Sequence, residues 1–269
     1  MYPAAFEYHA PASVADALKL LGKLDDAKIL AGGHSLIPMM KLRLAQPKHL
    51  IDLRKVPGLT GIKEDKGMIS IGAMTTHWEV ESSKVLKSKC AVVSETAAMI
   101  GDPAVRNKGT IGGSLAHGDP AADMPATAIA LGAELVCQGK KKRTVKVDDW
   151  FTGIMETAIG EDELLVEVRV PRTGAAGWAY EKFTRRANDW AIVAVAVVDG
   201  RVGLVNMGPT PLRASATEAA LAGGASIAEA AALADQDTDP PADLAGSKEY
   251  RRHLARLLTR RALTTAHDR

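Results

Sequence analysis

The stretch Ala31–Leu36 has the sequence AGGHSL and stands between two segments of regular apolar pattern. The pattern predicts a short strand at Lys28–Ala31 before it and a short helix at Leu36–Leu44 after it, with Pro38 at an early helical position. Ser35 stands where a helix N-cap is expected. Glycine accepts positive φ and lets other groups approach the backbone, so a glycine pair can leave several N–H donors in one concavity. This order of strand, glycine turn and helix start indicates an anion-binding turn.

A second stretch, Thr110–Leu115, has the sequence TIGGSL and repeats nearly the same arrangement far along the chain. One glycine pair alone is most simply a tight turn, but two matching copies favour a shared role. If the two turns face one another, a diphosphate fits between them, with one phosphate at each set of amides. No GxGxxG follows a strand and no GxxxxGK[ST] occurs, which argues against a Rossmann fold and a P-loop. The sequence therefore predicts a dinucleotide held in another way.

The composition bounds the function class. A chain of 269 residues with 46% hydrophobic content can bury more than one core, which favours several domains. The 34 basic and 32 acidic residues nearly balance, so the charge indicates neither nucleic acid nor an anionic membrane as partner. Cys90 and Cys137 lack a CxxC partner, which argues against zinc, iron–sulfur and disulfide sites. With no basic leader and no apolar run of about 18 residues, we expect a cytoplasmic protein.

The chain divides into three predicted units, at residues 1–55, 56–174 and 175–269, with the stretch RTGAAG at 172–177 as a linker. In the third unit the pattern predicts three strands and then alanine-rich helices. These strands are Trp178–Thr184, Ala191–Val198 and Arg201–Asn206.

Two stretches rich in turn-forming residues, Ile100–Gly109 and Ala116–Pro125, flank the second glycine turn. We expect both to be loops, with a helix at Ala126–Leu131 after the second. Long loops inside compact domains are more often functional than idle.

Several single residues have a structural and a functional interpretation. Asp123 precedes a predicted helix, so its simplest role is an N-cap, although a carboxylate there can also reach a ribose hydroxyl. His34 and His117 stand beside the two turns, but no third ligand has suitable spacing, so we expect no metal site. Trp190 begins an apolar stretch and is by default an ordinary core or edge aromatic. No serine elbow or activated cysteine is present, so we expect no catalytic nucleophile.

Four segments share a pattern of ordered motifs. They are Ala31–Leu44, Ile71–Thr76, Arg106–Ser114 and Asp119–Pro125. Together they resemble the FAD-binding medium subunit of molybdenum hydroxylases, a family shared with the FAD-binding part of xanthine dehydrogenase, and most nearly its aerobic carbon monoxide dehydrogenase branch. The similarity extends over nearly the whole chain, including Tyr180–Phe183 and Asp189–Ala191.

The resemblance implies a mixed α/β and α+β fold. The first two units would be α/β subdomains of the FAD-binding fold found in vanillyl-alcohol oxidase, the PCMH type, and would grip FAD between them. The third unit would be a C-terminal domain with a three-stranded antiparallel sheet and helices.

The resemblance also implies roles for single residues. Asp123 would reach the adenosine ribose, and Lys182 would approach the pyrimidine edge of the flavin. Trp190 matches a position where relatives place a residue, often tyrosine, against the isoalloxazine; tryptophan keeps the stacking surface but lacks the phenol. The cofactor would be lined by Leu36, Ile37, Ile100 and Leu165. The diphosphate would be held by Ala31, Gly32, Gly33, His34 and Ser35 of the first turn and by Thr110, Ile111, Gly112, Gly113 and Ser114 of the second.

The implied function is electron transfer within a heterotrimer, with a dimer of heterotrimers as one arrangement. Electrons from a substrate oxidised at a large molybdenum-cofactor subunit would pass through [2Fe–2S] clusters of a small subunit to this FAD, and then to an external acceptor such as a quinone. Carbon monoxide, heterocycles, aldehydes and purines all stay open as substrates, because the partner subunit selects among them. The alternatives are a self-sufficient FAD-dependent oxidoreductase with its own small substrate and a flavin-free scaffold on the same fold.

Overall fold

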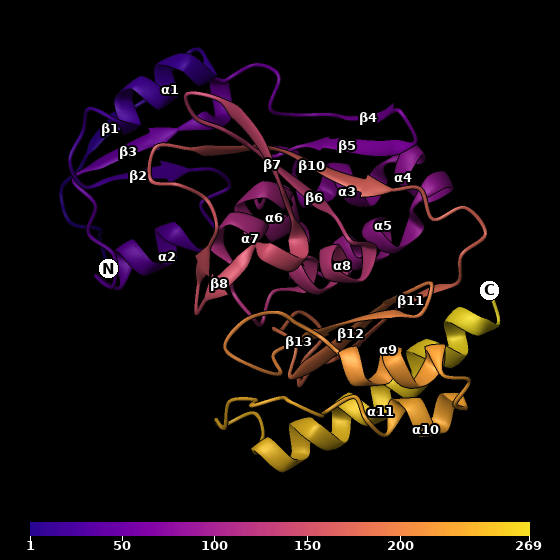
Figure 1. Cartoon of the computed structure of the whole chain (residues 1–269). Helices are drawn as coiled ribbons and strands as arrows, with labels where there is room; N and C mark the ends of the chain where they lie inside the picture. Colours follow the sequence, from indigo (N-terminus) through magenta and orange to yellow (C-terminus); the bar gives the residue numbers. More distant parts are fainter.

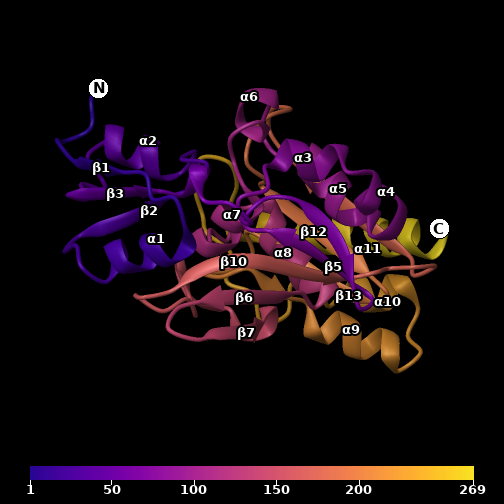
Figure 2. The ribbon, with the colours of Figure 1, turned by 90° about the horizontal axis from the view of Figure 1, so that it is seen from above.

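The computed structural model describes all residues from Met1 to Arg269 and begins with a small parallel sheet, drawn in indigo in Figure 1. Its strands are β1 (Glu7–His9), β2 (Ala27–Leu30) and β3 (His49–Asp52), in the order β1-β3-β2. Helices α1 (Val14–Leu21) and α2 (Leu36–Lys41) lie on opposite faces of this sheet (Figures 1 and 2), and the short 3-10 turn η1 (Leu53–Lys55) ends the unit. Ser13 is the N-cap of α1, and its side chain accepts a hydrogen bond from the Asp16 N–H.

The second unit is built on a five-stranded antiparallel sheet in the order β4-β5-β10-β6-β7. Its strands are β4 (Ile62–Asp65), β5 (Met68–Gly72), β6 (Glu134–Gln138), β7 (Lys142–Lys146) and β10 (Leu164–Pro171). The helices of this unit are α3 (His77–Ser82), α4 (Lys84–Lys89), α5 (Ala91–Ala98), α6 (Pro103–Arg106), α7 (Ile111–His117) and α8 (Asp123–Leu131). The 3-10 turn η2 (Val147–Asp149) leads into a small hairpin, β8 (Phe151–Gly153) and β9 (Glu156–Thr157).

The third unit is a four-stranded antiparallel sheet covered on its outer face by helices, at the bottom of Figure 1. The strands, in spatial order, are β11 (Trp178–Phe183), β12 (Val193–Val198), β13 (Arg201–Val205) and β14 (Leu212–Arg213). The helices are α9 (Ser215–Ala222), α10 (Ile227–Ala231) and α11 (Lys248–His267). Every residue of β12 is buried because helices pack on both faces of this sheet.

Helix α8 joins the second and third units. It lies between the five-stranded sheet and the sheet of β11–β13 (Figure 1), and all of its residues are buried. Its sequence, DMPATAIAL, is apolar on all sides except for Asp123 and Thr127, as expected of a helix covered all round. The apolar core of the second unit also includes Ala196 and Val198 of β12. The core of the second unit therefore extends to the sheet of the third, which has a further core of its own between that sheet and α11.

The fold class inferred from the sequence is confirmed, but several local expectations are wrong. The expected loop at Ile100–Gly109 contains the helix α6. The second glycine stretch is not a turn between loops but the first turn of α7, with Thr110 as its N-cap. Helix α8 begins at Asp123 rather than Ala126, because the two sheets bury its first turn as well. The predicted three-stranded sheet is extended by the two-residue strand β14. The unit boundaries at 55 and 174 stay a prediction.

Candidate functional site

The two glycine motifs lie in direct contact. A Cβ atom added to Gly32 would stand 2.2 Å from the carbonyl oxygen of Lys108 and 2.7 Å from the Cα atom of Gly109. A Cβ atom on Gly113 would stand 3.5 Å from the Cβ atom of Ala31. The backbones can approach this closely only because Gly32 has no side chain. The first and second units therefore meet where the two motifs meet.

The first motif presents a run of free N–H groups at this junction. None of the N–H groups of Gly32, Gly33, His34 and Ser35 donates a backbone hydrogen bond. Gly33 has a φ of +76°, and it alone among the four motif glycines has positive φ. Gly32, Gly33 and Ser35 are half-buried and His34 is exposed, so the run is accessible from outside. Consecutive free amides in a glycine-containing turn are the donor set that suits a phosphate.

The N–H groups of Ile111 to Ser114 in the second motif are used within the chain. Those of Ile111 and Gly112 donate to the carbonyl oxygens of Thr75 and Ala73, at 3.0 and 2.9 Å. The N–H of Gly113 donates to Thr110 Oγ1 at 3.0 Å. The expectation of a second set of free amides is therefore wrong, because these bonds fasten α7 to the end of β5.

The glycines of the second motif serve close packing instead. A Cβ atom on Gly112 would lie 2.5 Å from both the Cβ and the carbonyl oxygen of Ala73. What this motif leaves near the junction is the pair of hydroxyl groups on Thr110 and Ser114, one at the N-cap and one in the first turns of α7.

His77 lies directly behind the second motif, and no sequence pattern singled it out. The backbone N–H of His77 donates to the carbonyl oxygen of Gly109 at 2.9 Å. A Cβ atom added to Gly109 would lie 2.9 Å from the imidazole ring of His77. The ring is buried, and its Nδ1 has no hydrogen-bond partner. Burial, together with the nearby positive charges of His34 and Arg106, lowers the pKa of His77 to about 4. The imidazole is therefore neutral at pH 7. The only sequence signal was the capping box that starts α3.

A second group of predicted site residues meets where the side chain of Asp123, at the start of α8, reaches β11. Lys182 Nζ lies 3.0 Å from Asp123 Oδ2 and 2.8 Å from the carbonyl oxygen of Met99. The Tyr180 hydroxyl donates to the other carboxylate oxygen of Asp123. The side chains of Lys182 and Asp123 are only 2% and 7% exposed. Burial raises the pKa of Asp123 although Lys182 and Tyr180 favour its charged form.

The N-cap role considered for Asp123 is wrong. Asp123 is the first residue of α8 and not the residue before it, and its carboxylate turns to β11 instead of capping the helix. Its predicted contact with ribose stays a prediction. In the structure one carboxylate oxygen of Asp123 accepts from Tyr180 and the other from Lys182. Asp123 and Lys182 are therefore direct neighbours.

The four residues predicted to line the cofactor are all apolar. Arg106 holds the segment next to Met99, by donating to the carbonyl oxygens of Ile100 and Gly101 at 3.1 and 3.3 Å. Leu165 is buried in the core shared with α7, at a β-bulge of β10. Leu36 is half-buried and Ile37 exposed at the start of α2.

Trp190 is 58% exposed. Of the two ordinary roles considered for it, core or edge aromatic, the exposure excludes the core role, and the strand expected from Ala191 begins only at Val193.

The segment from Met99 to Asp123 connects the two groups. It begins at the Lys182 contact, passes the junction at Gly109, runs through α7 and ends at the Asp123 carboxylate. Free amides at the junction of the two motifs, and exposed apolar side chains such as Met99 beside the buried lysine of the second group, suit a diphosphate joined to a flat heterocycle. The residues present therefore fit a flavin dinucleotide.

Two family descriptions match the chain. "FAD binding domain in molybdopterin dehydrogenase" covers residues 4–173, and "CO dehydrogenase flavoprotein C-terminal domain" covers residues 178–266. None of the helices combines the length and the apolar character that a membrane crossing demands.

Individual relatives match along the full length. The carbon monoxide dehydrogenase medium chain of Hydrogenophaga pseudoflava is 45% identical over 285 residues, covering 100% of this chain and 99% of the relative. A solved structure of carbon monoxide dehydrogenase from the same organism, lacking the Mo-pyranopterin moiety, superposes with a TM-score of 0.97 at 46% identity, covering 100% and 99% of the two chains. The solved structure of quinoline 2-oxidoreductase from Pseudomonas putida 86 superposes with a TM-score of 0.93 at 33% identity, covering 100% of this chain and 99% of that one.

These matches cover the glycine motifs, the second group and the C-terminal sheet alike. The chain therefore belongs to the FAD-binding subunits of molybdenum hydroxylases, in the carbon monoxide dehydrogenase flavoprotein family, and its cofactor is FAD.

Proposed function

We propose that this chain is the electron-transfer subunit of a heterotrimeric molybdenum hydroxylase most like aerobic carbon monoxide dehydrogenase. Electrons from a substrate oxidised at a large molybdenum-cofactor subunit pass through the [2Fe–2S] clusters of a small subunit to FAD on this chain. An external acceptor such as a quinone then receives them. We further propose that the complex is cytoplasmic and that two heterotrimers associate.

The observation that carries this proposal is the run of free amides where the two glycine motifs touch. In the proposed complex the N–H groups of Gly32, Gly33, His34 and Ser35 bind the diphosphate, supported by the free backbone donors in the structure. The hydroxyl groups of Thr110 and Ser114 complete the donor set. The remaining motif residues, Ala31, Ile111, Gly112 and Gly113, keep the two backbones close.

The second group orients the flavin ring. Lys182 is fixed between Asp123 and the carbonyl oxygen of Met99, so its ammonium group has a defined position for the pyrimidine edge. Trp190 offers an exposed flat surface for the isoalloxazine. Bound FAD supplies the redox chemistry, since it accepts and releases electrons one or two at a time. The chain itself binds the cofactor, orients its ring and limits solvent access.

Carbon monoxide is the substrate favoured for the complex. The relative named for carbon monoxide dehydrogenase shares 45% of its residues with this chain, against 33% for the quinoline enzyme. The choice of substrate is made in the large subunit, so reduction of the whole complex by carbon monoxide is the test of this proposal.

The test is purification of this chain alone and together with its proposed large and small partners. We expect a yellow protein with one FAD per chain in both cases. Carbon monoxide should bleach the flavin absorption of the complex and leave that of the isolated chain unchanged. A colourless chain that FAD cannot reconstitute would overturn the proposal. Turnover of a small substrate by the isolated chain would favour the self-sufficient oxidoreductase instead.

A further inference from the structure

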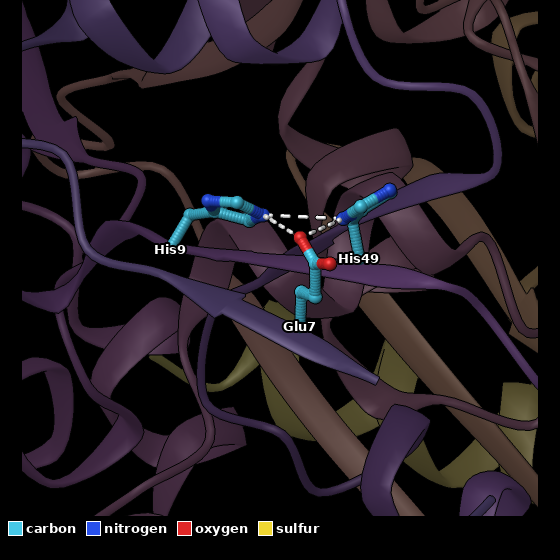
Figure 3. Close-up of side chains that lie close together, drawn as sticks. All are labelled: Glu7, His9 and His49. Carbon is cyan, nitrogen blue, oxygen red and sulfur yellow. Dashed lines mark hydrogen bonds and ion pairs between the residues drawn. The ribbon is translucent and has the colours of Figure 1, made fainter. Parts of the chain in front are cut away.

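Three potential metal ligands meet over one face of the first sheet, between its edge strand β1 and its central strand β3, as Figure 3 shows. Glu7 and His9 lie two residues apart on β1 and so project to the same side of the strand. The parallel register places Glu7 opposite His49 of β3. Residues that are 40 positions apart in sequence are thus brought together by strand pairing alone.

The three ligand atoms form a triangle of the size that a small metal ion requires. His9 Nε2 lies 3.2 Å from His49 Nδ1, His49 Nδ1 lies 3.3 Å from Glu7 Oε2, and His9 Nε2 lies 3.9 Å from Glu7 Oε2. The point equidistant from three atoms so spaced lies about 2.0 Å from each, which matches the bond lengths of Zn²⁺ to imidazole nitrogen and carboxylate oxygen.

A hydrogen bond between the two rings explains this arrangement only in part. That bond uses one proton, on either His9 Nε2 or His49 Nδ1, and the facing nitrogen without the proton keeps a lone pair beside the Glu7 carboxylate. A divalent cation at the centre of the triangle uses all three electron pairs at once. The site is reachable, since the side chains of His9, His49 and Glu7 are 23%, 18% and 73% exposed.

We propose that Glu7, His9 and His49 bind a divalent transition-metal ion such as Zn²⁺. Two imidazoles and one carboxylate are a ligand set that zinc and its neighbours prefer over Ca²⁺ or Mg²⁺. The fourth position is open to water or to a group of another molecule.

The bound ion ties β1 to β3. Strand β1 has only three residues and pairs with β3 alone, so few backbone hydrogen bonds hold it in the sheet. It lies at the opposite edge of the sheet from β2, the strand that leads into Gly32. Metal binding is therefore independent of FAD binding, and its failure would not affect the proposed function.

The experiment is a calorimetric titration of ZnCl₂ into the full chain, freed of metal with a chelator and carrying no histidine tag. We expect one ion per chain and a midpoint of unfolding about 5 °C higher at saturating zinc. The expected dissociation constant is on the order of 10 µM. Absence of binding at 1 mM zinc, about a hundred times that concentration, would overturn the proposal.

Variants locate the site. His9→Ala and His49→Ala should each weaken zinc binding at least about tenfold, which is the loss of one good ligand. Glu7→Gln should weaken it too and leave the fold intact, because Glu7 is the most exposed of the three. His253→Ala removes an exposed histidine on α11 and should bind zinc as the natural chain does. Unchanged affinity in both cluster histidine variants would also refute the site, whereas FAD content should stay the same in all of them.

Discussion

Gly32 is the residue on which contact between the two glycine motifs depends. In Gly32→Ala the added Cβ would overlap the backbone of Lys108 and Gly109, which no side-chain rotation can relieve. The first motif must then move away from the second, and the free amides lose their place beside it. We expect FAD affinity to fall at least about tenfold, or about 1.4 kcal/mol, in a fluorescence titration of FAD into the flavin-free chain.

Gly22→Ala is the matched control for this prediction. A Cβ atom on Gly22 meets only the carbonyl oxygen of Leu18, at an ordinary 3.5 Å. Its FAD affinity should equal that of the natural chain. Equal affinity in Gly32→Ala as well would remove the motif contact from the binding site.

His77 makes stability depend on pH at the residue scale. Its pKa is lowered from an ordinary 6.5 to about 4 by burial, so between these values the unfolded chain binds a proton that the folded chain does not. Stability contributed by the neutral ring is complete above pH 6.5 and is lost as the pH falls toward 4. Between pH 7.5 and 5.0 the loss from this one group is about 2 kcal/mol.

The measurement is urea unfolding of the flavin-free chain at both pH values, for the natural chain and for His77→Gln. Glutamine does not titrate, so the variant should lose about 2 kcal/mol less between pH 7.5 and 5.0, whatever its stability at pH 7.5. An identical pH dependence in the two proteins would show that His77 is not buried in its neutral form.

At the scale of elements, α11 is fixed by a buried arginine that the sequence pattern did not single out. Arg251 donates from one guanidinium nitrogen to both carboxylate oxygens of Asp243 at 2.7 Å and from another to the carbonyl oxygen of Ile192. These bonds hold the segment before α11 and the segment after Trp190 against one helix. A fork of this geometry is available to arginine and not to lysine.

We expect Arg251→Leu to lower the free energy of unfolding by about 2–3 kcal/mol, because it leaves a carbonyl and a carboxylate without their charged donor. Arg260→Leu, at an exposed position of the same helix, should change it by less than about 0.5 kcal/mol. Urea unfolding followed by circular dichroism measures both. A loss in Arg251→Leu as small as in Arg260→Leu would show that the buried fork adds no stability.

At the scale of the whole molecule, the pair of Lys182 and Asp123 links the second and third units. Removing one partner of a buried ion pair lowers the free energy of unfolding by more than the intact pair contributes to it, because the remaining charge is left unpaired in a poorly polar site. Lys182→Met should therefore destabilise the chain by about 3 kcal/mol at pH 8.

The stability lost in Lys182→Met should become smaller as the pH falls. Burial already raises the pKa of Asp123, and without Lys182 the pKa rises further, so the folded state takes up a proton before the unfolded state does. The double variant Lys182→Met with Asp123→Asn should recover most of the stability at pH 8. Denaturant unfolding of the flavin-free proteins at pH 8 and pH 5 tests this; no recovery in the double variant would contradict it.

Much of this architecture is readable from local patterns. The strands around Met68, Glu134 and Val193 and the helix after Ser247 follow from apolar period and caps, which depend only on neighbours in sequence. Strand β4, with its mostly exposed residues IKED, has no such period, and it is a strand only because β5 offers it an edge.

By itself the sequence determined the family, the FAD cofactor and the position of both glycine motifs, because these depend on residue types at fixed spacing. The tertiary structure alone decided which of the motif amides stay free, since Thr75 and Ala73 take those of the second motif through contacts between distant segments. It also brought His77 behind Gly109 and Asp123 to Lys182. Such pairings arise from strand order and helix packing, and no pattern of neighbouring residues encodes them.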